Sequence, residues 1–452
     1  MSVSLLIERY SRHLTDDDID RAVNIAPSQL VLHGSDANKL ADRLDGTLRR
    51  IFKSDRQVRK LIRYFLSVAQ AKAETHMFSE ASYTAGLYGA SPWGHIMSPA
   101  ICLTGLGGVG KTDLFHALGR LLGPAVPFSV RGHSNLKLSQ VWHLNASEGL
   151  GLNALLRPHI REDIDRDESV LERPKEIRAP RLLGLASRAS WRDGVCLMLA
   201  DELQHVSFGA DSNAQVTALL IKLLQVGPRV AFGANFSLLH KLLKRKQEDH
   251  QRLLTRPLLM EPMAVDDLDL SAYMREICSV APDVLALDPT QHQEQLHLYT
   301  FGIKRVIVEL VVLAFRLARS RSPRATVGGQ ELLAAYRSFD YSANREAVEL
   351  LHRQSIQKQM LREDLWCPLS GVECVETGPT NVVNADSAIL NFERRIEDAL
   401  LEATLGTAVL KEQSCSPKRS AHEKPKAVVT PIRSRKAKKE DLIAGANAWG
   451  DL

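Results

Sequence analysis

The sequence predicts an α/β fold, a parallel sheet flanked by helices, within a chain of 452 residues. Three observations lead to this prediction. Apolar runs typical of strands alternate with helical patterns from about residue 98 to residue 262. The first apolar run leads into a glycine-rich loop and then into a helix. Helical patterns precede and follow this stretch, so the sheet belongs to one central domain, residues 98–262.

Five strands are expected in the central domain, because five short apolar runs are separated by helical or turn-rich segments. They are Ala100–Leu103, Gln140–Leu144, Val195–Leu199, Arg229–Phe232 and Pro257–Met260. Between the second and third of them, Arg157–Pro180 is dense in charge and poor in aromatic residues. We therefore expect that segment to be a surface insertion.

Helices are expected on both sides of the sheet domain. Residues 1–97 should form a helical N-terminal domain that binds a partner, and residues 263–340 a small helical lid. Residues 341–412 are predicted to be a helical extension and linker, with one helix at Ala388–Glu402.

The C-terminal tail, residues 413–452, is predicted to be disordered because it has many lysines and prolines and few apolar residues. The net charge of the chain is +5. The segment from Ser414 to Glu440 alone carries +7, with nine basic residues and two acids, so the rest of the chain carries −2. Contact of the body with nucleic acid must therefore come from local patches. The apolar end Leu442–Leu452 suggests a peptide that docks on a partner.

Composition also predicts the compartment. No run of eighteen apolar residues is present, and the most apolar stretch, Val306–Phe315, is expected to be a core helix. The first residues show no signal-peptide pattern, and two of the six cysteines fall in predicted strands, which favours a cytoplasmic protein without disulfides. Cys367 and Cys374 have no second Cys or His pair after them, so a zinc site is not expected.

The ten residues Gly105–Leu114 match the phosphate-binding pattern G-x-x-x-x-G-K-[ST] at every required position. Glycines let backbone N–H groups point at phosphate oxygens, and the following helix directs its positive end at the same anion. Lys111 should reach the β- and γ-phosphates, and Thr112 should hold Mg²⁺. The nucleotide-contacting residues are expected to be Gly105, Gly107, Gly108, Val109, Gly110, Lys111, Thr112 and Asp113. The alternative, a glycine-rich turn with a chance Lys-Thr, would rarely produce a full match.

A second motif, Cys196–Glu202, is an apolar strand that ends in two acids. Asp201 should hold Mg²⁺ directly or through water, and Glu202 should activate the attacking water as a general base. The alternative is a buried strand followed by helix-start acids. Its position about ninety residues after the phosphate loop favours the catalytic interpretation. ATP and Mg²⁺ are the expected cofactors, and ATP hydrolysis is the expected activity.

Further positions resemble the AAA+ branch of P-loop ATPases. Asn235, after the fourth strand, resembles the sensor-1 residue that orients the hydrolytic water, and Arg305 resembles the sensor-2 arginine that contacts the γ-phosphate. Arg252 and Arg256 precede the fifth strand, where AAA+ proteins place an arginine finger for the neighbouring subunit. We favour Arg256 for this role. The alternatives are a loop asparagine and solvated arginines.

Several segments together resemble the TnsC/TniB family of transposition ATPases, over about residues 98–335. They are Asp201-Glu-Leu-Gln-His205, Ala234-Asn235, the arginine-containing segment up to Pro262, Thr300-Phe-Gly-Ile-Lys-Arg305 and Gln140–Gly149. The resemblance implies a regulator that forms a homo-oligomeric ring or filament on duplex DNA, with hydrolysis controlling assembly. It also implies two protein partners, a target-selecting protein and a DDE transposase, the latter bound through the C-terminal tail. No membrane partner is expected.

Two features of the sequence leave room for other interpretations. The insertion Arg157–Pro180 is longer than this family would suggest. The basic patch Lys241–Lys246 would suit sequence-independent DNA contact, or it could be a solvated face answered by Glu248 and Asp249. A helicase loader of the IstB or DnaC type, a STAND-type signalling NTPase and a scaffold that binds ATP without turnover are the alternative functions.

Overall fold

A computed structural model describes residues 2–10, 14–32, 34, 36–89, 92–94, 97–130, 132–146, 151–161, 177–203 and 212–369. All described residues belong to one compact unit, which spans Met1–Val372 and which we call the first unit. The predicted helix Ala388–Glu402 and tail 413–452 lie outside the described residues, as do Gln204, His205 and most of the insertion Arg157–Pro180.

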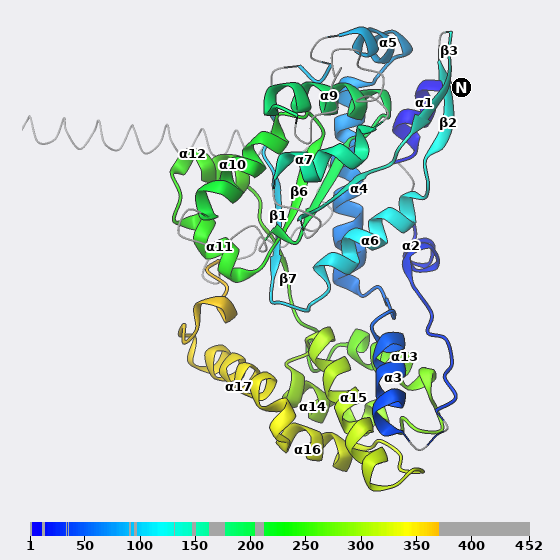
Figure 1. Ribbon diagram of the computed structural model, residues 1–452, viewed down its shortest axis with the longest axis vertical. Helices are drawn as coiled ribbons and strands as arrows, with labels where there is room; N and C mark the ends of the chain where they lie inside the picture. The colour runs from blue at the N-terminus through cyan, green and yellow to red at the C-terminus, as the bar shows by residue number, and fades with distance from the viewer. Residues whose placement is uncertain are drawn as a thin grey trace, which may run out of the picture. The chain divides into compact units, whose positions relative to one another are not determined.

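A five-stranded parallel sheet occupies the centre of the first unit (Figure 1), which confirms the predicted α/β fold. Its strands are β1 (Ile101–Gly105), β4 (Trp142–Asn145), β5 (Leu197–Asp201), β6 (Arg229–Ala234) and β7 (Leu258–Met260). Their order in space is β4-β5-β6-β1-β7. Each predicted strand ends within two residues of the observed one. β1 is buried along its whole length, because helices cover both faces of the sheet.

An antiparallel hairpin, β2 (Val126–Val130) and β3 (His133–Leu138), is absent from the sequence prediction. In its first strand, exposed Pro127 and Ser129 alternate with buried Phe128 and Val130. Such a short half-buried strand lacks the continuous apolar run that marks the strands of the central sheet.

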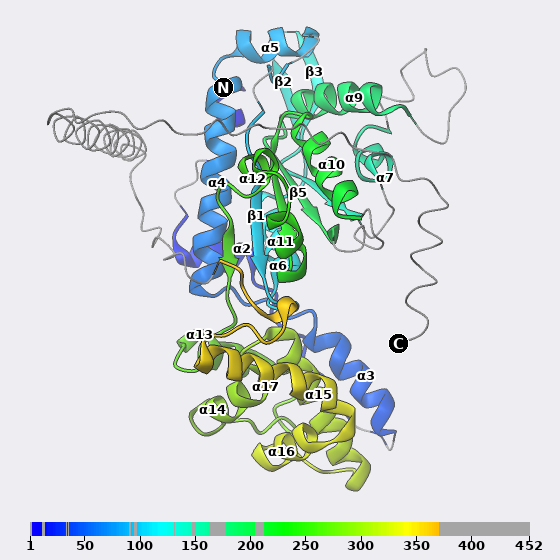
Figure 2. The same ribbon diagram turned by 90° about the vertical axis from the view of Figure 1, so that its left-hand side faces the viewer.

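Helices associated with the sheet are α1 (Ser2–Glu8), α2 (Asp16–Val23), α4 (Arg56–His76), α5 (Glu80–Tyr88), α6 (Lys111–Leu122), α7 (Leu152–Leu156), α9 (Ala179–Arg192), α10 (Ser212–Leu224), α11 (Phe236–Leu243) and α12 (Gln247–Leu253). The long helix α4 lies along the sheet in both views (Figures 1 and 2). The side chain of Asp55, just before the helix, caps it, and the helix buries a stripe with helical spacing that includes Val58, Ile62, Phe65 and Ala69.

A second hydrophobic cluster includes most of the predicted lid, and we keep that name for it. It contains α3 (Ala37–Leu48), α13 (Leu268–Val280), α14 (Pro289–Thr300), α15 (Lys304–Arg321) and α16 (Gly329–Arg337), followed by α17 (Ser342–Gln357). Figure 2 shows α3, in blue, beside these yellow-green helices. Residues 1–97, expected as one N-terminal domain, thus contribute to both clusters. No described helix combines the length and apolar character that a membrane span needs. The stretch Val306–Phe315 lies within α15 and is largely buried.

A close backbone contact holds the segment after β7 against the turn before α15. Gly302 has a left-handed φ of 69°, and a Cβ atom at this position would lie 2.0 Å from the carbonyl oxygen of Met263. The Met263 N–H donates to the Gly302 carbonyl at 3.1 Å. Only glycine fits such a position, and this contact fixes where α15 begins.

The chain returns from the lid to the sheet domain after α17. Buried Gln354 accepts hydrogen bonds from the N–H groups of Leu361 and Arg362, each at 2.9 Å. The short helix η5 (Glu363–Leu365) then packs on α11, where the carboxylate of Glu363 lies 2.8 Å from Lys244 Nζ. Residues 358–369 therefore form a second connection between the two hydrophobic clusters, which we name the return strap.

Candidate nucleotide site

The phosphate-binding loop lies between β1 and α6, at the carboxyl edge of the sheet. Gly108 and Gly110 have left-handed φ angles of 84° and 110°. A Cβ on Gly108 would lie 2.7 Å from the Cβ of Arg305, and a Cβ on Gly105 would lie 2.4 Å from the carbonyl oxygen of Met260. These positions therefore require glycine, both for backbone conformation and for close approach of neighbouring segments. Gly107 has open space around it, and Val109 is buried.

Lys111 extends back over the loop. Its ammonium group donates to the carbonyl oxygens of Gly105 at 2.9 Å and Leu106 at 2.8 Å. Burial lowers the pKa of Lys111 to about 8; the carboxylate of Asp201 opposes this shift, and the guanidinium of Arg305 adds to it. The charges predicted from three separate motifs thus lie close enough to influence one another.

The two acids occupy the end of β5. Asp201 is half-buried, and its Oδ1 accepts the N–H of Glu202 at 2.9 Å. The same oxygen would lie 2.9 Å from a Cβ on Gly233, so the carboxylate rests over the end of the neighbouring strand β6. Glu202 has a φ of 58°, a left-handed conformation that is strained for a glutamate. Strained residues of this kind concentrate at functional sites.

Asn235 follows β6 and caps α11. Its Oδ1 accepts the N–H of Leu238 at 2.9 Å, so the side-chain oxygen already has a structural role. The Nδ2 amide is the group that remains to orient a water molecule. Strands β5, β6 and β1 are neighbours in the sheet, so Asp201, Asn235 and the phosphate loop share one edge.

Arg305 reaches this edge from the lid. Its backbone N–H donates to the Gly108 carbonyl at 3.2 Å, and its side chain is exposed. The preceding Thr300-Phe-Gly-Ile segment explains the placement. Phe301, at a φ of 53°, ends α14 in the left-handed conformation, and Gly302 makes the close contact described above before α15 begins.

Arg252 and Arg256 do not join this site. Both are exposed and lie before β7, at the amino edge of the sheet, and the Arg252 carbonyl accepts the N–H of Ala100 just before β1. Burial lowers the pKa of Arg229, the first residue of β6, and the positive charge of Arg256 adds to this shift. An arginine at the amino edge cannot serve its own phosphate loop, which follows the carboxyl end of β1.

The donor set at the carboxyl edge suits Mg²⁺. Thr112, half-buried in the first turn of α6, supplies a hydroxyl, and Asp201 supplies a carboxylate. Mg²⁺ prefers oxygen ligands and is usually held by one or two protein groups together with waters and phosphate oxygens. Among the described residues, no three His, Cys, Asp or Glu side chains are grouped so that they could hold a metal ion.

A histidine group beside the site was not foreseen from the sequence. His143 on β4 lies 6.1 Å, ring to ring, from His116 on α6, and its backbone carbonyl lies 2.9 Å from His159 Nε2. Burial lowers the pKa of His143; His116 and His159 add to this, and Asp201 opposes it. These histidines come from three separate elements, so no local motif marks them.

The basic patch Lys241–Lys246 lies at the end of α11, and two of its residues form ion pairs with acidic side chains. Lys244 pairs with Glu363 of the return strap at 2.8 Å, and Arg245 pairs with Asp249 at 3.4 Å. This arrangement favours the solvated-face interpretation for Lys244 and Arg245. Asp249 is one of the two acids that the sequence suggested; Glu363 is not.

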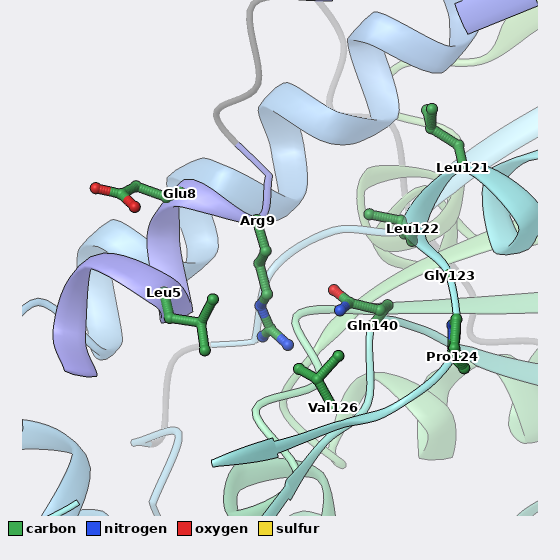
Figure 3. Close-up of a pocket in the computed structure, with 9 residues that line it drawn as sticks. All are labelled: Leu5, Glu8, Arg9, Leu121, Leu122, Gly123, Pro124, Val126 and Gln140. Carbon is green, nitrogen blue, oxygen red and sulfur yellow. The ribbon is translucent and has the colours of Figure 1, made fainter. Parts of the chain in front are cut away.

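A pocket of about 530 Å³ lies elsewhere, between α1 and the turn from α6 to β2 (Figure 3). Leu5, Leu122 and Val126 supply apolar walls, and Arg9 and Gln140 supply polar ones. Arg9 already donates to the carbonyl oxygen of Ser139 at 3.1 Å, which anchors α1 to the sheet domain. None of the predicted site residues lines this pocket.

No protein-family model and no curated protein sequence matches the chain. Among solved structures, the chain is similar to Orc1 of Aeropyrum pernix in complex with DNA, at 14% identity over 68% of each chain with a TM-score of 0.36. It is also similar to Cdc6p from Pyrobaculum aerophilum, at 13% identity over 56% of this chain and 64% of that one, with a TM-score of 0.35. It is similar as well to PCH-2 of C. elegans, at 15% identity over 66% of this chain and 69% of that one, with a TM-score of 0.35.

The strand order and the connections between the strands define the fold. The parallel strand order β4-β5-β6-β1-β7 places the phosphate loop after β1, between the strands that end in Ala234 and Met260. Asp201 ends β5, the strand on the other side of β6 from β1, and Glu202 follows it directly. The helices after β7 bring Arg305 back to the loop, where its N–H donates to Gly108. This combination is a parallel α/β sheet with a glycine-rich loop after β1 and a helical cluster after β7, as the sequence predicts.

Proposed function

We propose that the protein hydrolyses ATP at the carboxyl edge of the sheet. The observation that carries this proposal is geometric: the Lys111 ammonium lies on the phosphate loop, and the Arg305 N–H donates to the Gly108 carbonyl of that loop at 3.2 Å. The charges of Asp201, Glu202 and Arg305 also lie close enough to influence the pKa of Lys111. Backbone N–H groups of the loop and Lys111 would bind the phosphates. Glu202 would take a proton from the attacking water, and Arg305 would face the γ-phosphate.

Thr112 and Asp201 would hold Mg²⁺, which neutralises charge that develops on the β- and γ-phosphates. Asn235 would orient the attacking water through its Nδ2 amide, since its oxygen caps α11. The remaining loop residues, Gly105, Gly107, Gly108, Val109, Gly110 and Asp113, would surround the nucleotide.

Hydrolysis would require a second copy of the chain. Arg256 lies at the opposite edge of the sheet from its own phosphate loop, and within the described residues its side chain makes no ion pair or hydrogen bond. An exposed, unpaired guanidinium can enter the site of a neighbouring subunit and stabilise charge in the transition state. The proposed assembly is therefore a head-to-tail ring or filament.

We further propose that this assembly forms on duplex DNA and regulates transposition, linking a target-selecting protein to a DDE transposase. What supports this is the combination of Asp-Glu-Leu-Gln-His with Thr-Phe-Gly-Ile, which resembles the TnsC/TniB family. Contacts to phosphates would make DNA binding independent of sequence and sensitive to salt. The transposase would bind the tail 413–452.

ATP turnover measured with and without nucleic acid tests the proposal. Duplex DNA should stimulate the wild-type protein, and Lys111→Ala should show no turnover. Stimulation by single-stranded DNA alone would favour a helicase loader. ATP turnover that is the same with and without DNA would favour a signalling NTPase. ATP binding without turnover would favour a scaffold.

A further inference from the structure

Two basic residues open α15, against the usual charge preference of a helix. The helix begins at Lys304 and Arg305, and Ile303 before it provides no side-chain cap. Cations at this end face the positive pole of the helix dipole, which disfavours them. Residues that break a local rule in this way are expected at functional sites.

The two cations have different surroundings. Lys304 Nζ lies 3.0 Å from Asp55 Oδ2, and the two side chains are only 15% and 11% exposed. Arg305 is exposed, and its side chain makes no hydrogen bond or ion pair in the part of the chain that the structure describes. One cation is therefore anchored, and the other is available to an anion.

Asp55 is itself held firmly. Its Oδ1 accepts the N–H of Val58 at 2.7 Å and so caps α4. Two residues later, Gln57 donates to the Leu259 carbonyl at 3.1 Å and accepts the N–H of Glu261 at 3.2 Å. The first turn of α4 is thereby fixed to the end of β7, immediately before the chain enters the lid.

Lys304 also lies against the phosphate loop. Its Cδ would be 3.7 Å from a Cβ on Gly110, and the next residue, Arg305, donates its N–H to Gly108. Any shift at the start of α15 would therefore move Arg305 relative to the loop.

We propose that Asp55 is a positioning residue for the ATPase site, which it serves by holding Lys304. The ion pair neutralises one of the two cations and fixes the first turn of α15, so that Arg305 meets the γ-phosphate in a set geometry. This inference rests on the proposed ATP hydrolysis. It adds a residue about fifty positions before the phosphate loop to that site.

Variants of the pair separate this role from direct phosphate binding by Lys304. If Asp55 positions the helix, Asp55→Asn and Lys304→Met should each lower kcat by about 10- to 100-fold, because small misplacements of a catalytic group cost that much. The double variant D55N/K304M should be no worse than either single one. Affinity for ADP, which lacks the γ-phosphate, should stay unchanged in all of them.

If Lys304 instead binds phosphate and Asp55 merely restrains it, D55N should tighten nucleotide binding and keep kcat, while K304M should weaken nucleotide binding. That result would overturn the proposal. Glu276→Gln is the matched control. It breaks the Lys53–Glu276 pair at 3.2 Å, which joins the same segment to α13 but not to α15, and it should leave kcat within about twofold of wild type, as a partly exposed pair should.

Hydrogen exchange provides a readout that does not depend on hydrolysis. The Arg305 amide, bonded to the Gly108 carbonyl, should exchange faster in D55N than in wild type or E276Q. A wild-type protein without turnover would contradict the proposed function, while exchange would still decide the role of Asp55. Unchanged exchange in D55N would overturn the inference.

Discussion

Glu202 combines an unusual backbone conformation with the position expected of a general base. Its φ of 58° is stabilised by the hydrogen bond from its own N–H to Asp201. A strained backbone is maintained only where the surrounding structure determines it, and the packing of Asp201 against Gly233 provides that constraint.

Glu202→Gln should remove hydrolysis and leave nucleotide binding intact. The amide keeps the size of the side chain but cannot accept a proton, so turnover should fall by about 100-fold or more. Turnover and ATP affinity measured on the same preparation test this. Turnover near the wild-type rate would show that another group activates the water.

The lowered pKa of Lys111 predicts that ATP affinity depends on pH. Burial lowers its pKa from 10.5 to about 8, and phosphate oxygens beside it would favour the charged form and raise this pKa again. Above about pH 8, ATP binding should therefore take up a proton, and affinity should fall as pH rises. Below about pH 7, Lys111 is charged in both states and no uptake by this residue is expected.

Calorimetry in two buffers of different ionisation enthalpy measures that proton uptake. At a pH between 8 and 9 the apparent binding enthalpy should differ between the buffers by an amount that corresponds to uptake. Equal enthalpies at this pH would show that Lys111 does not change its protonation state on binding.

At the scale of elements, the two glycine substitutions Gly302→Ala and Gly46→Ala should have opposite effects. Gly302 has a φ of 69° and meets the Met263 carbonyl, so alanine there should lower the free energy of unfolding by at least about 1–3 kcal/mol. Gly46 lies inside α3 with nothing within 4 Å of its Cβ position, so alanine there should raise it by about 0.5–1 kcal/mol.

Urea titration of both variants checks this pair. A tolerated Gly302→Ala would mean that the connection between β7 and α15 adapts easily. The close contact at Gly302 would then not fix the start of α15, and the account of how Arg305 reaches the loop would lose its structural basis.

The elements that the sequence predicts are those with strong local patterns. The strands of the parallel sheet are continuous apolar runs, and the phosphate loop is a contiguous motif, so both could be found. The hairpin of β2 and β3 could not, because exposed Pro127 and Ser129 interrupt its apolar residues. Contacts between distant segments also leave no local signal. The packing of α3 on α15 and the pair of Asp55 with Lys304 depend on tertiary structure.

At the scale of the whole molecule, the position of Arg256 predicts complementation between defective subunits. Arg256→Ala should lower turnover by about 10³-fold or more if it acts as an arginine finger. Mixed with Lys111→Ala, it should recover about a quarter of wild-type turnover, because some head-to-tail contacts then join an intact phosphate loop to an intact arginine.

Arg252→Ala serves as the matched control, since Arg252 is also exposed and lies on the same edge of the sheet. It should retain turnover. Loss of activity with Arg252→Ala and not with Arg256→Ala would exchange the two roles, and no effect of either would argue against a shared site.

Imaging of the purified protein on duplex DNA, with a non-hydrolysable ATP analogue, tests the central claim most directly. A sample without nucleotide and a Lys111→Ala sample provide the comparison. Rings or filaments should form on DNA only with wild-type protein and the analogue. No assembly on DNA under any of these conditions would contradict the account of an ATP-dependent regulator that oligomerises on DNA.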